Sequence, residues 1–208
     1  MMKKIIILIV ATALLLSCSG RVKKLPQDIK EWYNLHSILM TADVPTWIFD
    51  GGKSEKWCFL RLPEKMQRLY INIFWKVRIP GLSDLFYRRV ATANYLYGGW
   101  RTDQGWACIV CGVPDEIRYV RSMRKEEGSD IQGHRLQIWY YYFGGSRMRI
   151  VFEWRYSEWR LSMDTSLHGL SNYTFLTKRN LKKFKPTEEG WEMIGNMALE
   201  WVRKKEKK

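Results

Sequence analysis

Apolar side chains recur at helical spacing in the first half of the chain. One stripe runs from Asp28 to Thr41, and a second runs from Leu62 to Pro80, where Pro63 stands at the first turn. A third segment begins at Ser83, a residue suited to capping a helix, and ends at Gly98-Gly99. We therefore expect three helices before residue 100.

In the second half, apolar and polar side chains alternate as they do in strands, and a helical pattern returns near the C-terminus. Strands are predicted over 117–121, 136–143, 148–156 and 159–163, with a hairpin turn at Gly144-Gly145. The apolar run 106–111 is expected to form one further strand, and 164–185 an irregular stretch. Thr187 is expected to cap a last amphipathic helix. This order predicts that residues 28–208 form a single α+β domain. Its meander antiparallel sheet of about four or five strands would carry the N-terminal helices and the C-terminal helix.

Residues 99–117 hold the most specific motif. Gly99-Trp100-Arg101-Thr102-Asp103 is followed by Gly105, an apolar run and Gly112-Val113-Pro114-Asp115-Glu116-Ile117. This arrangement resembles the GWxTD domain of bacterial envelope proteins, whose signature is Gly-Trp-x-Thr-Asp, a glycine, a strand and Gly-x-Pro-Asp-Glu-Ile. The preceding Phe74-Trp75-Lys76-Val77-Arg78 is also similar to that family, although Ile79 replaces its usual acidic residue. The resemblance implies an envelope protein and implies no reaction.

Every signature position has a structural interpretation. Glycines suit turns with positive φ, and a tryptophan is large enough to fill the junction between helix and sheet. Threonine and aspartate commonly accept hydrogen bonds from backbone N–H groups of a turn. The two acidic residues after the proline would place negative charge near free N–H groups of a following turn. These candidate structural or binding residues are Gly99, Trp100, Thr102, Asp103, Gly105, Gly112, Pro114, Asp115 and Glu116.

An enzymatic interpretation uses the same carboxylates. Asp103, Asp115 and Glu116 could supply an acid and a base if they converged on a cleft. The chain has no Gly-x-Ser-x-Gly motif, so a serine hydrolase of that kind has no support. No catalytic residue is therefore assigned from the sequence.

The first residues predict a lipoprotein signal peptide over 1–17. Lys3 and Lys4 precede an apolar run from Ile5 to Leu16, and Ser17-Cys18 follows it. Such a run spans about 18 Å as a helix, which is short of the roughly 30 Å of hydrocarbon in a bilayer. We expect Cys18 to carry the lipid, with residues 18–27 as a tether, since several acyl chains make a stable anchor. The alternative is a plain secretory signal or a short anchor.

The charge of the chain is strongly basic. The formal net charge is +14, and removal of residues 1–17 with their two lysines would lower it to +12. For an exported protein this balance favours anionic lipid head groups or an anionic envelope polymer over nucleic acid. The basic clusters 21–24 and 203–208 are equally typical of solvated tails.

Cysteine and histidine usage gives no indication of a metal site or another cofactor. Cys108 and Cys111 have the spacing of a redox or zinc pair, but in the expected strand their side chains would point to opposite faces. Cys58 is left over, and His36, His134 and His168 have no ligand spacing. We expect no metal and no cofactor.

Eleven tryptophans exceed what a small core usually needs. An exposed aromatic platform beside basic groups would suit glycan stacking, peptide contact or a membrane interface. We expect the core to hold Trp75, Trp139, Trp191 and Trp201, and the surface to hold Trp57, Trp106, Trp154 and Trp159.

Three functional hypotheses follow. The favoured one is a lipid-anchored binding or assembly protein of the bacterial envelope, which engages an envelope protein or anionic polymer and catalyses no reaction. The second is an envelope enzyme acting on glycan or peptide through the signature carboxylates. The third is a structural subunit of a secretion or gliding-type complex. Ser19 follows the lipidated cysteine where an aspartate would favour retention, so the expected location is the outer membrane, facing the periplasm. In a host without an outer membrane it would be the cell membrane.

We predict that Cys18→Ala abolishes membrane anchoring, because the thiol is the expected lipid attachment site. Fractionation of cells that express the parent and the variant measures this. The variant should be recovered as soluble or unprocessed protein. If it is processed and fractionates like the parent, there is no lipid anchor at Cys18.

Overall fold

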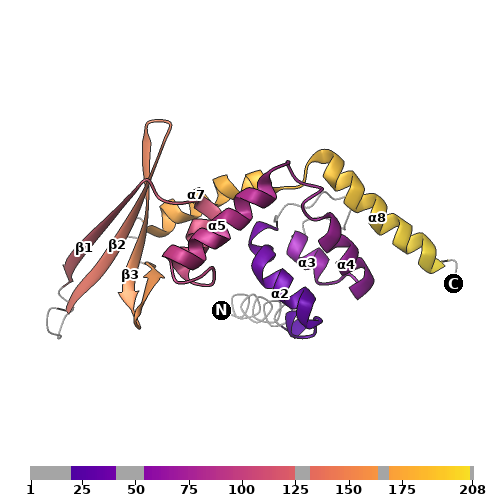
Figure 1. The fold of residues 1–208 in the computed structure, drawn as a ribbon, viewed down its shortest axis with the longest axis horizontal. Coiled ribbons are helices and arrows are strands. Elements are labelled where there is room, and N and C mark those ends of the chain that lie inside the picture. The colour runs from indigo at the N-terminus through magenta and orange to yellow at the C-terminus, as the bar shows by residue number, and fades with distance from the viewer. Residues whose placement is uncertain (1–19, 41–53, 125–131, 164–168, 207–208) are drawn as a thin grey trace, which may run out of the picture. The chain divides into compact units, whose positions relative to one another are not determined.

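The computed structural model describes residues 20–40, 54–124, 132–163 and 169–206. These residues confirm the predicted α+β class, with helices packed on a meander sheet (Figure 1). The chain divides into two compact units, and each is described by itself. Unit 1 contains Met1–Pro80 and Phe184–Lys208, and unit 2 contains Gly81–Lys183. The expected signal peptide and Cys18 lie outside the described residues.

Unit 1 is helical. It contains α2 (Gln27–His36), the 3₁₀ turn η1 (Ser37–Leu39), α3 (Glu55–Phe59), α4 (Glu64–Ile73) and α8 (Glu188–Glu206), and α8 contacts α4. The helix expected over 28–41 is confirmed as far as His36, after which the chain continues as η1. Helix α3 is an addition to the predicted helices, and Ser54 caps it by accepting a hydrogen bond from the Trp57 N–H at 3.2 Å.

The helix expected over 62–80 ends earlier, at Ile73. Beyond it the chain tightens, since the N–H of Phe74 donates to Ile71 O and that of Arg78 to Trp75 O, three residues back. The Arg78 guanidinium donates a hydrogen bond to the Phe74 carbonyl oxygen at 2.6 Å. In a continued helix the Phe74 carbonyl would instead accept from the backbone N–H of Arg78.

A buried ion pair joins three segments of unit 1. The Arg78 guanidinium is fully buried and donates to Glu55 Oε1 at 2.5 Å and to Phe184 O at 2.7 Å. It also lies over the Phe74 ring, 3.6 Å from the centroid. The Tyr70 hydroxyl donates to the same Glu55 oxygen. A buried pair is tolerated when further hydrogen bonds satisfy both charges, as they do here.

The first turn of α8 approaches the end of the α4 segment closely. The Thr187 N–H donates to Val77 O at 2.8 Å, and the Thr187 hydroxyl accepts from the Gly190 N–H at 3.0 Å, which confirms the expected cap. A Cβ at Gly190 would lie 2.1 Å from Val77 O. Only glycine permits this contact.

Unit 2 contains the sheet. Its antiparallel strands β1 (Glu116–Arg124), β2 (Gln132–Phe143), β3 (Ser146–Arg155) and β4 (Glu158–Leu161) follow chain order, so that β2 lies between β1 and β3 (Figure 1). Gly144 and Gly145 form the predicted hairpin turn with φ of 55° and 73°. The four strands after residue 115 are therefore confirmed.

The helices of unit 2 bring three corrections. They are α5 (Leu82–Leu96), α6 (Asp103–Cys111) and α7 (Gly169–Leu181), with η3 (Lys182–Phe184) at the boundary between the units. The strand expected over 106–111 is helix α6, because a short run that is apolar on every side has no period to distinguish the two states. The irregular stretch expected over 164–185 contains α7. Ser83 lies inside α5, which begins after Gly81 in a left-handed conformation.

We predict that His36 makes unit 1 sensitive to acid. Its ring is 2% exposed and stacks on Trp32, and its Nδ1–H donates to Trp32 O at 2.8 Å. Burial, together with the nearby Arg78 charge, lowers its pKa to about 4. The unfolded chain binds this proton near the ordinary value of 6.5, so between these two values it holds more protons than the folded chain. Stability should therefore fall by about 3 kcal/mol as the pH drops through that window.

Urea unfolding of the parent and of His36→Gln at several pH values measures this. The variant should lose most of the slope in that window. An unchanged slope would show that other groups carry the acid sensitivity.

Candidate functional site

The signature turn is built around a close backbone approach in unit 2. Gly98 and Gly99 leave α5 with φ of 70° and 111°, as expected. The Thr102 hydroxyl has two backbone acceptors in reach, Tyr97 O at 2.7 Å and Gly99 O at 2.9 Å, and it accepts from the Gly105 N–H at 2.9 Å, which caps α6. A Cβ at Gly105 would lie 1.9 Å from Gly99 O. The spacing of glycine, threonine and glycine is thus a steric requirement.

Asp103 ties this turn to the sheet. Its Oδ2 accepts from the backbone N–H of Leu161 in β4 at 2.7 Å. The expectation that threonine and aspartate accept from backbone N–H groups holds for both residues. It was wrong about the donor to Asp103, which belongs to a strand 58 residues further along the chain rather than to the turn.

Trp100 does not fill the junction between helix and sheet. It is half-buried, with Arg101 over its ring at 4.9 Å, and its backbone N–H donates to Asn94 Oδ1 at 3.0 Å. The junction is filled by Tyr97, whose ring centroid lies 4.7 Å from that of the fully buried Trp139. The expected role of Trp100 was therefore wrong, because the turn directs the preceding aromatic residue inward.

The second half of the signature anchors β1 to β2. After Gly112, at φ 90°, and the buried Pro114, the Asp115 Oδ2 accepts from the Tyr142 N–H at 2.7 Å. Glu116 begins β1 and bonds Arg118 and the Tyr142 hydroxyl, and these two partners lower its pKa. The expectation that these carboxylates lie near free N–H groups of a following turn was therefore wrong, since their partners are in β1 and β2.

The three carboxylates do not converge. Asp103 is held on β4, whereas Asp115 and Glu116 are held against β2, and β3 separates these two strands. Glu116, with its lowered pKa, stays ionised at neutral pH and is unsuited to act as a general acid.

Cys108 and Cys111 share a face of α6, because residues three apart on a helix are neighbours. The expectation that they point to opposite faces was wrong, since it depended on a strand. Burial raises the pKa of Cys108 to about 11 and that of Cys111 to about 12, and the nearby Arg89 only partly opposes this. Both thiols are therefore protonated and poor nucleophiles at neutral pH. Among the described residues no group of three or more His, Cys, Asp or Glu side chains is placed to hold a metal ion.

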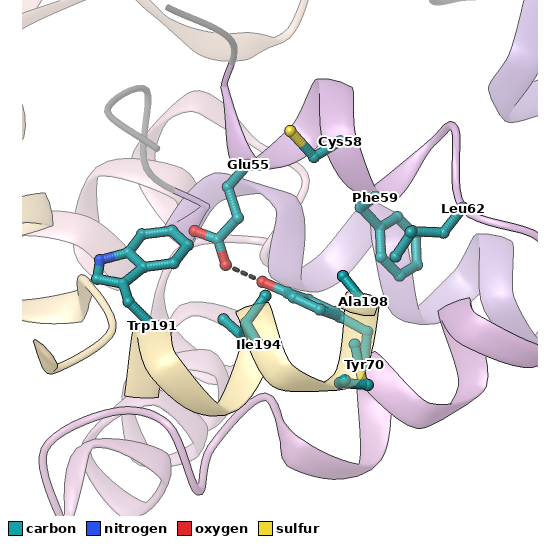
Figure 2. Close-up of a pocket in the computed structure, with 9 residues that line it drawn as sticks. Glu55, Cys58, Phe59, Leu62, Tyr70, Trp191, Ile194 and Ala198 are labelled. Carbon is teal, nitrogen blue, oxygen red and sulfur yellow. Dashed lines mark hydrogen bonds between the residues drawn. The ribbon is translucent and has the colours of Figure 1, made fainter. Parts of the chain in front are cut away.

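The cavity of unit 1 is too small for a ligand. It has a volume of about 10 Å³, roughly the room for one water molecule. Figure 2 shows the Glu55 carboxylate and the Tyr70 hydroxyl pointing toward one another across it. Its lining residues are Glu55, Cys58, Phe59, Leu62, Tyr70, Trp191, Ile194, Met197 and Ala198. It is a gap in packing around the buried ion pair.

A much larger cleft lies beside the signature turn in unit 2. Its volume is about 450 Å³, within the range of about 300 to 1,000 Å³ that is usual for small-molecule sites. The end of α5, the start of α6 and all four strands line it. The lining residues are Leu96, Tyr97, Gly98, Thr102, Gln104, Ile117, Tyr119, Gln137, Trp154, Glu158 and Trp159.

Amide groups meet at the polar side of this cleft. The Gln104 amide donates to Gln137 Oε1, which also accepts from Trp139 Nε1 at 3.2 Å. Gln137 Nε2 donates to the Tyr119 hydroxyl at 2.8 Å. Sequence reasoning missed both glutamines. They could be found only once α6 was known to be a helix and Gln137 was known to lie opposite Tyr119 in the sheet.

Three aromatic side chains form what we call the aromatic shelf: Tyr119, Trp154 and Trp159. The Trp159 ring lies 5.2 Å from Trp154 and 6.1 Å from Tyr119, centroid to centroid. Tyr119 is 70% exposed and Trp154 is 39% exposed. Arg135 lies 5.4 Å from the Trp154 ring and opposite Arg121 across β1 and β2, so the shelf has a basic margin.

The tryptophan predictions are partly confirmed. Trp139 and Trp191 are buried as expected, but Trp75 is half-buried, and the side chain of Trp201 lies outside the described residues. Of the expected surface residues, Trp154 is exposed and Trp57, Trp106 and Trp159 are half-buried.

Comparison with known protein families, curated proteins and solved structures finds no match for this chain. The resemblance to the GWxTD domain therefore stays a prediction from residues 74–78 and 99–117. No described helix has the length and apolarity needed to span a bilayer.

We predict that Gly105→Ala destabilises the protein by about 3 kcal/mol, because its methyl group would overlap a backbone carbonyl that cannot rotate away. Thermal and urea unfolding measure the loss. Gly20→Ala is the matched control, since nothing lies within 4 Å of a Cβ at that position. Equal stability of the two variants would mean that the close approach at Gly105 is absent.

Proposed function

We propose that this chain is a lipid-anchored binding or assembly protein of the bacterial envelope, of the GWxTD domain type, without catalysis of its own. It would attach to the membrane through Cys18 and engage an envelope protein or anionic polymer through the aromatic shelf. The observation that carries the proposal is the shelf with its basic margin, Arg121 and Arg135, opening onto the cleft.

Charge and exposure support this use of the shelf. Aromatic residues and arginine are enriched where proteins contact partners, because they supply buried area together with hydrogen bonds. The excess of basic residues over the whole chain favours an anionic partner. Tyr119 and Trp154 are more exposed than core packing would leave them.

The signature carboxylates support a structural use instead of catalysis. Asp103 and Asp115 each accept a backbone N–H that would otherwise lack a partner in the sheet, and Glu116 is paired with Arg118. The enzymatic alternative would need these groups to meet substrate together.

The remaining alternative, a structural subunit of a secretion or gliding-type complex, is favoured by a groove in unit 1. The groove has a volume of about 530 Å³ and lies along α4 and α8, where Leu69 and Met193 are 41% and 45% exposed. Glu189, Glu192 and Glu200 flank its apolar floor. An uncovered apolar surface of this kind suits a stoichiometric partner.

We predict that retention of the purified protein on immobilised envelope extract weakens when NaCl is raised from about 50 to about 500 mM, because exposed charges are screened. The double variant Arg121→Glu, Arg135→Glu should abolish most of the retention. Lys65→Glu, Lys178→Glu is the matched control, with the same change in charge at exposed residues that do not line the cleft.

Two results would contradict the proposal. One is equal loss of retention in both double variants, which would mean that net charge alone acts. The other is turnover of peptidoglycan or envelope peptide by clean protein that Asp103→Asn or Glu116→Gln abolishes without loss of the fold.

A further inference from the structure

The polar side of the cleft has hydrogen-bonding capacity that the fold does not use. Gln104 is only 6% exposed and lines the cleft, and its Oε1 accepts no hydrogen bond from the described residues. Buried side-chain oxygens normally have a partner. An acceptor held in this way at the wall of a large cleft is suited to a donor on a ligand.

Other residues that line the cleft carry donors. Burial raises the pKa of Tyr97 to about 12, so its hydroxyl keeps its proton at neutral pH. Gln137 Nε2 uses one N–H for Tyr119, and the Tyr119 hydroxyl, which accepts that bond, retains its own proton as a donor. The cleft thus offers uncharged donors and acceptors side by side.

Aromatic rings also line the cleft. Trp154 and Trp159 pack edge to face at 70°, and Tyr119 continues the shelf from β1. Flat rings of this size supply contact area at little cost in side-chain freedom. A ligand that fits must be apolar on one face and carry hydroxyl or amide groups at its edge.

We propose that this cleft binds a pyranose sugar unit of a glycan. The C–H face of the ring stacks on the aromatic shelf, and its hydroxyl groups bond Gln104, Tyr97 and Glu158. A sugar hydroxyl both donates and accepts, which matches the mixed amide and phenol groups of the cleft. This inference deepens the proposed envelope-binding function and rests on it for the biological setting only.

Other ligand classes fit less well. A lipid tail would bury the Gln104 Oε1 without a hydrogen bond, which is unfavourable in free energy. A peptide added to a sheet edge would bond backbone groups there, whereas these groups are side chains on the face of the sheet.

The cleft is built for binding and not for hydrolysis. Glycoside hydrolysis generally requires two carboxyl groups flanking the scissile bond. Among the described residues that line the cleft, Glu158 is the one carboxylate, and it pairs with Arg160. The bound sugar is therefore released unchanged.

Titration of the purified chain with three tetrasaccharides, built of N-acetylglucosamine, glucose or mannose, tests the proposal by calorimetry and tryptophan fluorescence. At least one should bind, and Trp159→Ala should raise its dissociation constant about tenfold or more. Tyr119→Ala should act in the same direction. Tyr95→Ala is the matched control, because Tyr95 is 88% exposed on α5 and does not line the cleft.

Circular dichroism and thermal unfolding establish that each variant is folded before binding is compared. The proposal is overturned if no tetrasaccharide binds at about 10 mM, or if binding is unchanged in folded Trp159→Ala and Tyr119→Ala. It is also overturned if an unmodified tetrapeptide of alanine and glutamate binds at the shelf and the sugars do not.

Retention on envelope extract is measured with the same variants. Retention that depends on the shelf while sugars fail to bind removes the sugar proposal and leaves envelope binding intact. Sugar binding without retention removes the proposed function and leaves the sugar site.

Discussion

A backbone carbonyl packed against a helical glycine is the constraint on which both units depend. In unit 2 the carbonyl of Gly99 accepts from the Thr102 N–H and occupies the space of a Gly105 side chain. In unit 1 the carbonyl of Val77 stands in the same relation to Thr187 and Gly190. In each case threonine caps the helix, and glycine three residues later leaves room for a backbone carbonyl against the first turn. One local pattern, Thr-x-x-Gly, therefore begins two helices and lets a carbonyl lie against each: that of the preceding turn in α6, and that of the segment after α4 in α8.

The second constraint of unit 1 is electrostatic. Arg78 and Glu55 are buried as a pair, and the guanidinium also satisfies the carbonyls of Phe74 and Phe184. A charge in this position joins segments that are more than 100 residues apart in the sequence. This gives the Phe-Trp-x-x-Arg pattern a physical role, because arginine has enough donors to satisfy three acceptors at once.

In unit 2 the acidic and amide side chains have different uses. Asp103 and Asp115 accept backbone N–H groups of β4 and β2, so the acidic residues of the signature stabilise the sheet. Gln104, between Thr102 and Gly105, is directed to the cleft and keeps an acceptor that the fold leaves unused. The group most suited to recognition is therefore Gln104, which is not one of the residues that carry the resemblance.

The sequence by itself determined the elements whose pattern is local. Strand alternation, the Gly144-Gly145 hairpin and the Thr187 cap depend on neighbours a few residues away, and all are confirmed. Helix α6 was mistaken for a strand because a run that is apolar on all sides has no period, and α7 was missed. Tertiary structure alone decided the contact of Asp103 with β4, the inward position of Tyr97 and the meeting of Gln104 with Gln137. These contacts join residues from different elements, and strand register and helix placement, which no local pattern encodes, bring them together.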